Sequence, residues 1–319
     1  MKIEDLDSEF ANIKGCYERS NTILKKLEPL SGEFAESGTT LAITGSLARM
    51  EAAEGSDFDA YVIRSDDTET TDSAERLWSS ALEKSGLSDP SGTGNFGSDQ
   101  NLRCGEIVEN IGGNNDDTRK LSQRVSLFLE SKFIGDTDTA NELIDRIVAR
   151  YIGEKITNHQ LGMFLLNDII RFYRTICVDF EYKTEEEGKS WGIRNIKLVY
   201  SRKMIYFSGV IMCAELAQRS PGDKRRFCID MIQLTPVERV LKVMGIGALQ
   251  SLKYYDNFLG AMRDRNIRDE IKGVEADRRN DSETFVNLKN QGHRFGWSLR
   301  SMFMQHYDST HPIHKALMF

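Results

Sequence analysis

The stretch GSLARMEAAEGSDFD, residues 45–59, decides how this chain is interpreted. It follows the short β-rich segment TTLAIT, residues 39–44, and it precedes AYVI, residues 60–63. This order predicts a strand, then a turn that opens a short helix over residues 47–53, then a second strand over residues 57–63. The polar residues of the stretch are therefore expected to lie beside a tight turn.

The first part of the stretch has the features of a phosphate-binding turn. Gly45 allows the backbone to approach a ligand closely, and the backbone N–H groups of such a turn can hold a phosphate at the positive end of a helix. The hydroxyl of Ser46 can donate to a phosphate oxygen. We expect Gly45 and Ser46 to bind a nucleotide, together with Arg49 and Ser56 from the same stretch.

The second part carries two carboxylates, Asp57 and Asp59, separated by one residue. Alternate side chains of a strand point to the same face, so both should project together beside the Gly45 turn. Two like charges at that distance repel unless a cation lies between them, and carboxylate oxygens suit Mg²⁺ or Mn²⁺. The pair therefore predicts metal-assisted in-line displacement on a nucleoside triphosphate.

An Asp-x-Asp or a Gly-Ser pair alone is common on protein surfaces, but their combination at this spacing is specific. It resembles the DNA polymerase β-like nucleotidyltransferase superfamily, in which a Gly-Gly or Gly-Ser turn precedes an Asp-x-Asp or Asp-x-Glu pair. The segment GSLARME with SDFD, within residues 45–59, is also similar to the glutamine synthetase adenylyltransferases and the nitrogen-regulator uridylyltransferases.

The resemblance implies a third carboxylate on a later strand, which helps to deprotonate the attacking hydroxyl and to hold metal. No clean strand with a single central Asp follows in the sequence. Asp99 is the first candidate, Glu106 the second and Glu109 the third. Each is otherwise a solvated loop acid, and without any of them the metal would be held by two carboxylates only.

A second block of candidate residues lies further along the chain, in segments with helical spacing. Arg171, Arg194 and Lys197 are expected to form a cationic wall that neutralises a triphosphate or a strand backbone. The alternative is ion pairing, for example with Asp168, or plain solvent exposure. The run GIRNIK, residues 192–197, is similar to GIRDIE of the glutamine synthetase adenylyltransferases, but Lys197 replaces their acid.

The C-terminal region, from Trp297 to Phe319, is rich in Met, His and aromatic residues. Such a tail commonly docks on a neighbouring subunit, so we expect a homo-oligomer. A more specific hypothesis is that Tyr307 presents its hydroxyl to the active site as the nucleophile that primes a chain.

The pattern of segments predicts an α+β fold. We expect a nucleotidyltransferase domain over residues 1–115, with a small mixed sheet and helices, an all-helical domain over residues 116–307 that binds nucleotide or substrate, and a tail over residues 308–319. Helices are expected over residues 8–27, 71–85, 117–132, 139–152, 161–182, 193–216, 237–265 and 282–306.

Composition narrows the function further. The chain has 319 residues and a formal net charge of −7, which disfavours non-specific binding to duplex DNA. The five cysteines are scattered without C-x-x-C spacing, which argues against a zinc site and a disulfide scaffold. No apolar run reaches the roughly 20 residues of a membrane span, and the first residues do not resemble a signal peptide. We therefore expect a cytoplasmic protein that does not bind membranes.

These features predict a metal-dependent, template-independent nucleotidyltransferase that uses an NTP or dNTP and releases pyrophosphate. The chain resembles nucleotidyltransferases of bacterial anti-phage defence operons, including the Hailong type, which implies a short single-stranded oligonucleotide product and an effector protein as partner. The alternative is an enzyme that transfers AMP or UMP to a partner protein, as a toxin or regulator. A third hypothesis, a degenerate nucleotide-binding sensor, is disfavoured because Asp57, Asp59 and the Gly-Ser turn are intact.

Overall fold

The computed structural model describes residues 1–67, 72–90, 96–97, 101–109 and 111–318. The chain divides into two compact units. We call the first the helical unit; it comprises Met1–Gly15, Thr157–Arg219 and Pro236–Phe319. We call the second the sheet unit; it comprises Cys16–Ile156 and Ser220–Thr235.

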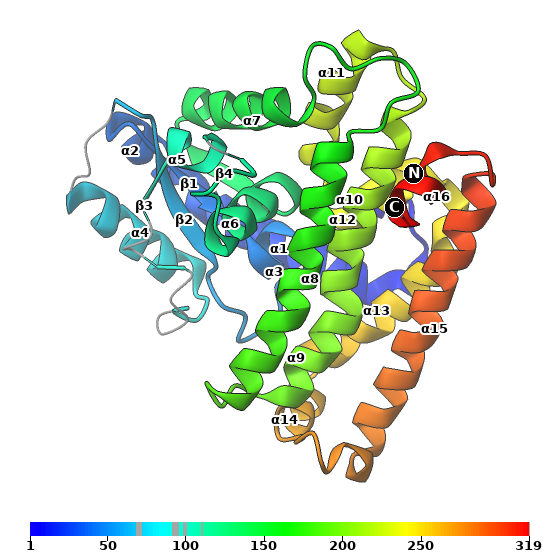
Figure 1. Cartoon of the computed structure of the whole chain (residues 1–319). Coiled ribbons are helices and arrows are strands. Elements are labelled where there is room, and N and C mark those ends of the chain that lie inside the picture. Colours follow the sequence, from blue (N-terminus) through cyan, green and yellow to red (C-terminus); the bar gives the residue numbers. More distant parts are fainter. Residues whose placement is uncertain (68–71, 91–95, 98–100, 110, 319) are drawn as a thin grey trace. The chain divides into compact units, whose positions relative to one another are not determined.

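The sheet unit is built on a mixed four-stranded sheet with the order β3-β2-β1-β4 (Figure 1). Its strands are β1 (Thr39–Ile43), β2 (Ala60–Arg64), β3 (Asn101–Arg103) and β4 (Lys132–Gly135). β1 pairs antiparallel with both β2 and β4, whereas β3 pairs parallel with β2. Together with the helices described below, this confirms the expected α+β class.

One face of the sheet is covered by apolar helices. They are α1 (Ala11–Leu27), the short α2 (Ser31–Glu36) and α4 (Asp72–Ser85). Leu41 of β1 and Val62 of β2 face each other in register and are fully buried with Phe34 of α2 and Trp78 of α4. This burial fixes the strand register, since a slip of one residue would move these side chains to the other face.

The opposite face is covered by a second set of helices. They are α5 (Cys104–Val108), α6 (Thr118–Leu129) and α7 (Thr137–Tyr151), and α11 (Pro221–Ile232) lies against α7. Arg124 of α6 is fully buried here, where its guanidinium forms two hydrogen bonds with Asp116 at 2.9 and 3.0 Å. Its Nε also donates to the hydroxyl of Tyr151 at 2.7 Å. A buried cation is thus fully matched by hydrogen-bonding partners.

The helical unit consists of longer helices around an aromatic core. They are α8 (Met163–Glu185), α9 (Trp191–Lys197), α10 (Lys203–Leu216), α12 (Pro236–Met244), α13 (Leu249–Arg263), α14 (Arg265–Lys272), α15 (Glu283–His306) and α16 (Pro312–Met318). A π-helical turn, Leu198–Arg202, joins α9 to α10. Tyr200 of this turn stacks on Phe258 and Phe295, with ring centroids 4.7 and 5.4 Å apart.

The structure differs from the sequence-based expectations at several boundaries. The predicted boundary after residue 115 falls inside the sheet unit, because β4 pairs with β1 and α6 and α7 cover the same sheet. β4 begins at Lys132, where a helix over residues 117–132 was expected. The expected tail contains α16, whose Ile313 is fully buried. Among the described residues, no helix is both long and apolar enough to span a bilayer.

Candidate functional site

The candidate site is built around Gly45, the residue at which α3 (Gly45–Ala48) begins directly after β1 and Thr44. Gly45 has a φ angle of +66°, a conformation that favours glycine. A Cβ atom placed on it would lie 2.2 Å from Oδ2 of Asp59. The turn therefore needs glycine for two reasons, and the carboxylate of Asp59 lies directly against it.

Strand pairing explains why Asp59 reaches this turn. Ile43 and Ala60 are paired in the β1–β2 register, so the residues that follow β1 meet those that precede β2. The N–H group of Thr44 donates to the carbonyl oxygen of Asp59 at 2.8 Å, which extends the pairing by one step. The backbone thus fixes the position of Asp59 beside Gly45.

Asp57 and Asp59 flank an inward-facing residue, Phe58. Phe58 is fully buried and meets the ring of Trp78 edge-on, with centroids 5.7 Å apart. Asp57 is exposed and Asp59 is half-buried, as expected for alternating side chains. The segment is nevertheless not part of β2, which begins at Ala60; Asp57 forms only an isolated bridge with Ser88. The expected strand over residues 57–63 therefore begins three residues late.

The turn after Gly45 is shorter than the expected helix over residues 47–53. α3 ends at Ala48, and Met50 adopts a left-handed φ of 62°. The N–H group of Glu51 donates to the carbonyl oxygen of Ser46 at 2.7 Å, which closes the turn. Ser46 itself is half-buried. The helix stops because its chain reverses at Met50.

Arg49 is buried among acids. Its Nε donates to Glu51 at 2.8 Å, and its Nη1 pairs with Glu130 at the C-terminal end of α6. The structure therefore places this predicted nucleotide-binding residue in an ion-pair cluster that ties the Gly45 turn to α6. Ser56, another predicted nucleotide-binding residue, accepts a hydrogen bond from the N–H group of Ala53 at 3.0 Å.

Tyr61 is a residue of this region that the sequence analysis missed. Burial raises the pKa of its hydroxyl, and the negative charges of Asp59 and Glu130 raise that pKa further, whereas a hydrogen bond with Ser126 and the charge of Arg119 lower it. The hydroxyl of Tyr61 is therefore influenced both by Asp59 and by residues of α6 and its C-terminal end. The sequence signal was the alternation after Asp59, which puts Tyr61 on the same face.

The third carboxylate is not located. Asp99, the first candidate, lies outside the described residues. Glu106 accepts a hydrogen bond from the N–H group of Arg103 at 3.5 Å and so caps α5, and Glu109 is exposed at the end of that helix. Over the described ranges, no group of three or more His, Cys, Asp or Glu side chains is placed to hold a metal ion.

The predicted cationic residues belong to the helical unit. Arg171 pairs with the buried carboxylate of Asp168 at 2.7 Å, which is the ion pair named above as the alternative to ligand binding. Arg194 and Lys197 lie on α9 and are half-buried. Arg171, Arg194 and Lys197 thus belong to the helical unit, whereas Asp57 and Asp59 belong to the sheet unit.

Tyr307 lies at the C-terminal end of α15 and is buried. Its hydroxyl donates to Glu215 at 3.1 Å, and burial together with the charge of Glu215 raises its pKa. A hydroxyl in this setting is neither exposed nor easily deprotonated, so the structure does not favour its role as a primer.

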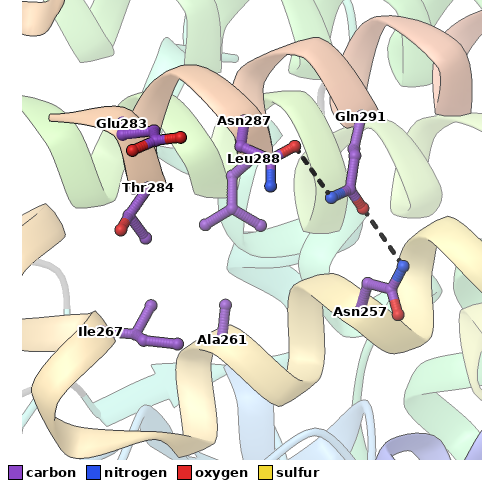
Figure 2. A pocket seen from close by; sticks show the side chains of 8 residues that line it. All are labelled: Asn257, Ala261, Ile267, Glu283, Thr284, Asn287, Leu288 and Gln291. Atoms are coloured by element: carbon purple, nitrogen blue, oxygen red, sulfur yellow. Dashed lines mark hydrogen bonds between the residues drawn. The ribbon is translucent and has the colours of Figure 1, made fainter.

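A pocket of about 410 Å³ lies in the helical unit, between α13, α14 and α15 (Figure 2). A row of amide side chains crosses from α13 to α15: Asn257 donates to Gln291 at 3.2 Å, and Gln291 donates to Asn287 at 3.3 Å. Ile267 of α14 and Ala261 of α13 lie across from Thr284 and Leu288 of α15 (Figure 2). The pocket contains none of the predicted site residues.

No protein-family model matches the chain, and no curated protein matches it either. The functional interpretation therefore depends on the residues and on their geometry.

Proposed function

We propose that this chain is a metal-dependent, template-independent nucleotidyltransferase of the DNA polymerase β-like type. The observation that carries the proposal is the contact of Asp59 with Gly45, since it joins the two halves of the sequence motif at one turn. Asp57 alternates with Asp59 across the buried Phe58, which leaves both carboxylates on the side away from the apolar core.

The donor atoms fit a hard divalent cation. Asp57 is exposed and Asp59 is half-buried, and carboxylate oxygens are ligands of the kind that Mg²⁺ and Mn²⁺ prefer. A bound cation would supply charge neutralisation for the triphosphate and would lower the pKa of the attacking hydroxyl. A third ligand would come from the chain or from the substrate.

The other residues of the turn would bind and orient the nucleotide. Gly45 leaves room beside the backbone for the carboxylate of Asp59, and the half-buried Ser46 would donate its hydroxyl to a phosphate oxygen. Arg49 would act as a positioning residue, because its ion pairs with Glu51 and Glu130 hold the turn in place.

The product and the partners follow from the sequence resemblance. We propose a short single-stranded oligonucleotide made in the cytoplasm, an effector protein that responds to it, and a homo-oligomeric enzyme with a role in anti-phage defence. The alternative is transfer of AMP or UMP to a partner protein, which uses the same aspartates.

The test is turnover with each labelled NTP and dNTP in the presence of Mg²⁺ or Mn²⁺. Soluble labelled oligomers would support the proposal, label on a protein would favour the alternative, and binding without pyrophosphate release would indicate a sensor. Asp57→Asn and Asp59→Asn should each lower turnover by about 10³-fold or more, because several kcal/mol of charge stabilisation is lost.

Asp145→Asn is the matched control, since Asp145 is an exposed carboxylate on α7 of the same unit. It should turn over like the wild type. Full activity in Asp57→Asn or Asp59→Asn, with the fold intact by circular dichroism, would reject the metal site.

A further inference from the structure

Two lysines of the helical unit, Lys203 and Lys289, lie where α15 passes α9 and the π-helical turn that leads into α10. Glycines allow this close crossing: a Cβ on Gly292 would lie 2.3 Å from Cγ1 of Val199, and one on Gly296 would lie 3.0 Å from Nζ of Lys203. Nζ of Lys289 donates to Oδ1 of Asn195 at 2.5 Å. Both lysines are half-buried.

The charge of this pair is not compensated within the described part of the chain. The pKa of Lys203 is lowered by burial, and the pKa of Lys289 is lowered by burial and by the positive charges of Lys203 and Arg279. No carboxylate contributes to either shift among the described residues. Two partly buried like charges are unfavourable unless an anion completes them.

The neighbouring surface of α15 adds an aromatic ring. Lys289, Trp297 and Arg300 lie on the same side of this helix by their spacing. Trp297 is 68% exposed, and the guanidinium of Arg300 lies 5.4 Å from the centre of its ring. Exposed aromatic rings beside cations are the usual platform on which single-stranded nucleic acids stack their bases.

We propose that Lys203, Lys289 and Trp297 form a binding site for a short single-stranded oligonucleotide. The two ammonium groups take a backbone phosphate, the amide of Asn195 orients Lys289, and a neighbouring base stacks on Trp297. The proposal extends the proposed function by naming where the product is held, and it rests on that function only for the identity of the strand. The site lies in the helical unit and uses neither Asp57 nor Asp59.

The test is direct binding of a fluorescein-labelled short oligodeoxythymidylate to the full chain. Anisotropy is measured in EDTA without nucleoside triphosphate, so the result is separate from any failure of turnover. Lys203→Met and Lys289→Met should each weaken binding about tenfold, the loss expected for one charge-assisted contact. Each should also make the slope of log affinity against log salt concentration shallower, by about the amount expected for one phosphate contact.

Two further variants distinguish binding of the phosphate from stacking of the base. Trp297→Ala should weaken the oligonucleotide about tenfold, but it should leave competition by inorganic phosphate unchanged. Lys253→Met is the control, because Lys253 lies in the same unit and pairs with Glu9 on the surface. It should bind like the wild type.

The proposal is overturned if the two lysine variants bind like the wild type, or if Lys253→Met weakens binding as much as they do. It is also overturned if inorganic phosphate competes but Trp297→Ala has no effect on the oligonucleotide. Where a methionine variant fails to fold, Lys289→Arg and Lys203→Arg decide the question. They retain the charge and must retain binding.

Discussion

Partly or fully buried cations have different surroundings in the two units. In the sheet unit, Arg124 is matched by Asp116, and Arg49 is matched by Glu51 and Glu130. In the helical unit, Lys203 and Lys289 lie near one another, and within the described ranges no carboxylate acts on them. This difference is the reason why we assign the arginines to the stability of the fold and propose the lysines as a ligand site.

The largest effect is expected from breaking the matched pair of the sheet unit. Arg124→Met should lower the free energy of unfolding by about 3–5 kcal/mol, because it leaves the carboxylate of Asp116 buried without its cation. Urea denaturation measures the change. The double variant Arg124→Met with Asp116→Leu should recover part of the loss, since no buried charge is left alone. A loss below about 1 kcal/mol for the single variant would show that this pair contributes no more to stability than a surface ion pair.

A smaller effect is expected from adding a Cβ atom at Gly45, against which the carboxylate of Asp59 lies. Gly45→Ala should cost about 2–4 kcal/mol of stability, because it combines a left-handed alanine with a Cβ that overlaps Asp59. Gly86→Ala is the matched control: Gly86 has a φ of +65° but no heavy atom near its Cβ position. It should cost only the conformational term of about 1–2 kcal/mol. Equal losses in the two variants would show that Asp59 does not constrain Gly45.

The smallest effect is expected at a partly exposed pair, Asp66 with Arg146. Asp66 accepts hydrogen bonds from Arg146 at 2.8 Å and from the N–H group of Gly105 at 2.7 Å. The hydrogen bond with Arg146 is the main cause that lowers the pKa of Asp66 below its usual 3.8, and burial opposes it. Asp66→Asn should therefore cost about 1 kcal/mol at neutral pH.

The pH dependence of that loss follows from the direction of the shift. The folded state binds the proton of Asp66 less readily than the unfolded state, so the stabilisation is present above the usual pKa of 3.8 and disappears as the pH falls through the lower folded value. Denaturation of the wild type and of Asp66→Asn should differ at pH ~7 and converge in strong acid. Glu9→Gln, which removes the surface pair with Lys253 in the helical unit, should leave the stability unchanged. A difference between wild type and Asp66→Asn that does not depend on pH would assign the effect to packing.

Local sequence patterns predicted three elements, α4, α15 and β1. The helices α4 and α15 have amphipathic spacing, and β1 is a short β-rich segment, so the residues of each element were enough to predict it. β4 could not be predicted, since only four residues pair with β1 after the helix α6. Its strand character arises from that long-range pairing and not from its own sequence.

The candidate site likewise combines residues that a local pattern predicts with a contact that depends on a residue far away in the sequence. Gly45, Asp57 and Asp59 were predicted from their spacing, because they lie in the short segments that follow β1 and precede β2, which are adjacent strands. The partner of Arg49, Glu130, is 81 positions away in the sequence, so its ion pair could not be inferred. The pairing of Arg171 with Asp168 spans only one helical turn, and the sequence named it as an alternative.

The interleaving of the two units has a consequence during synthesis. The first fifteen residues belong to the helical unit, and the main part of the sheet unit follows them. Thr157–Arg219 of the helical unit is translated next, then the α11 segment of the sheet unit, and last Pro236–Phe319 of the helical unit. Neither unit is therefore a single contiguous piece, and a nascent chain that stops before Pro236 lacks part of the helical unit. Any attempt to dissect the protein must join separated segments by a linker or a circular permutation, because a simple truncation removes structure from one unit or the other.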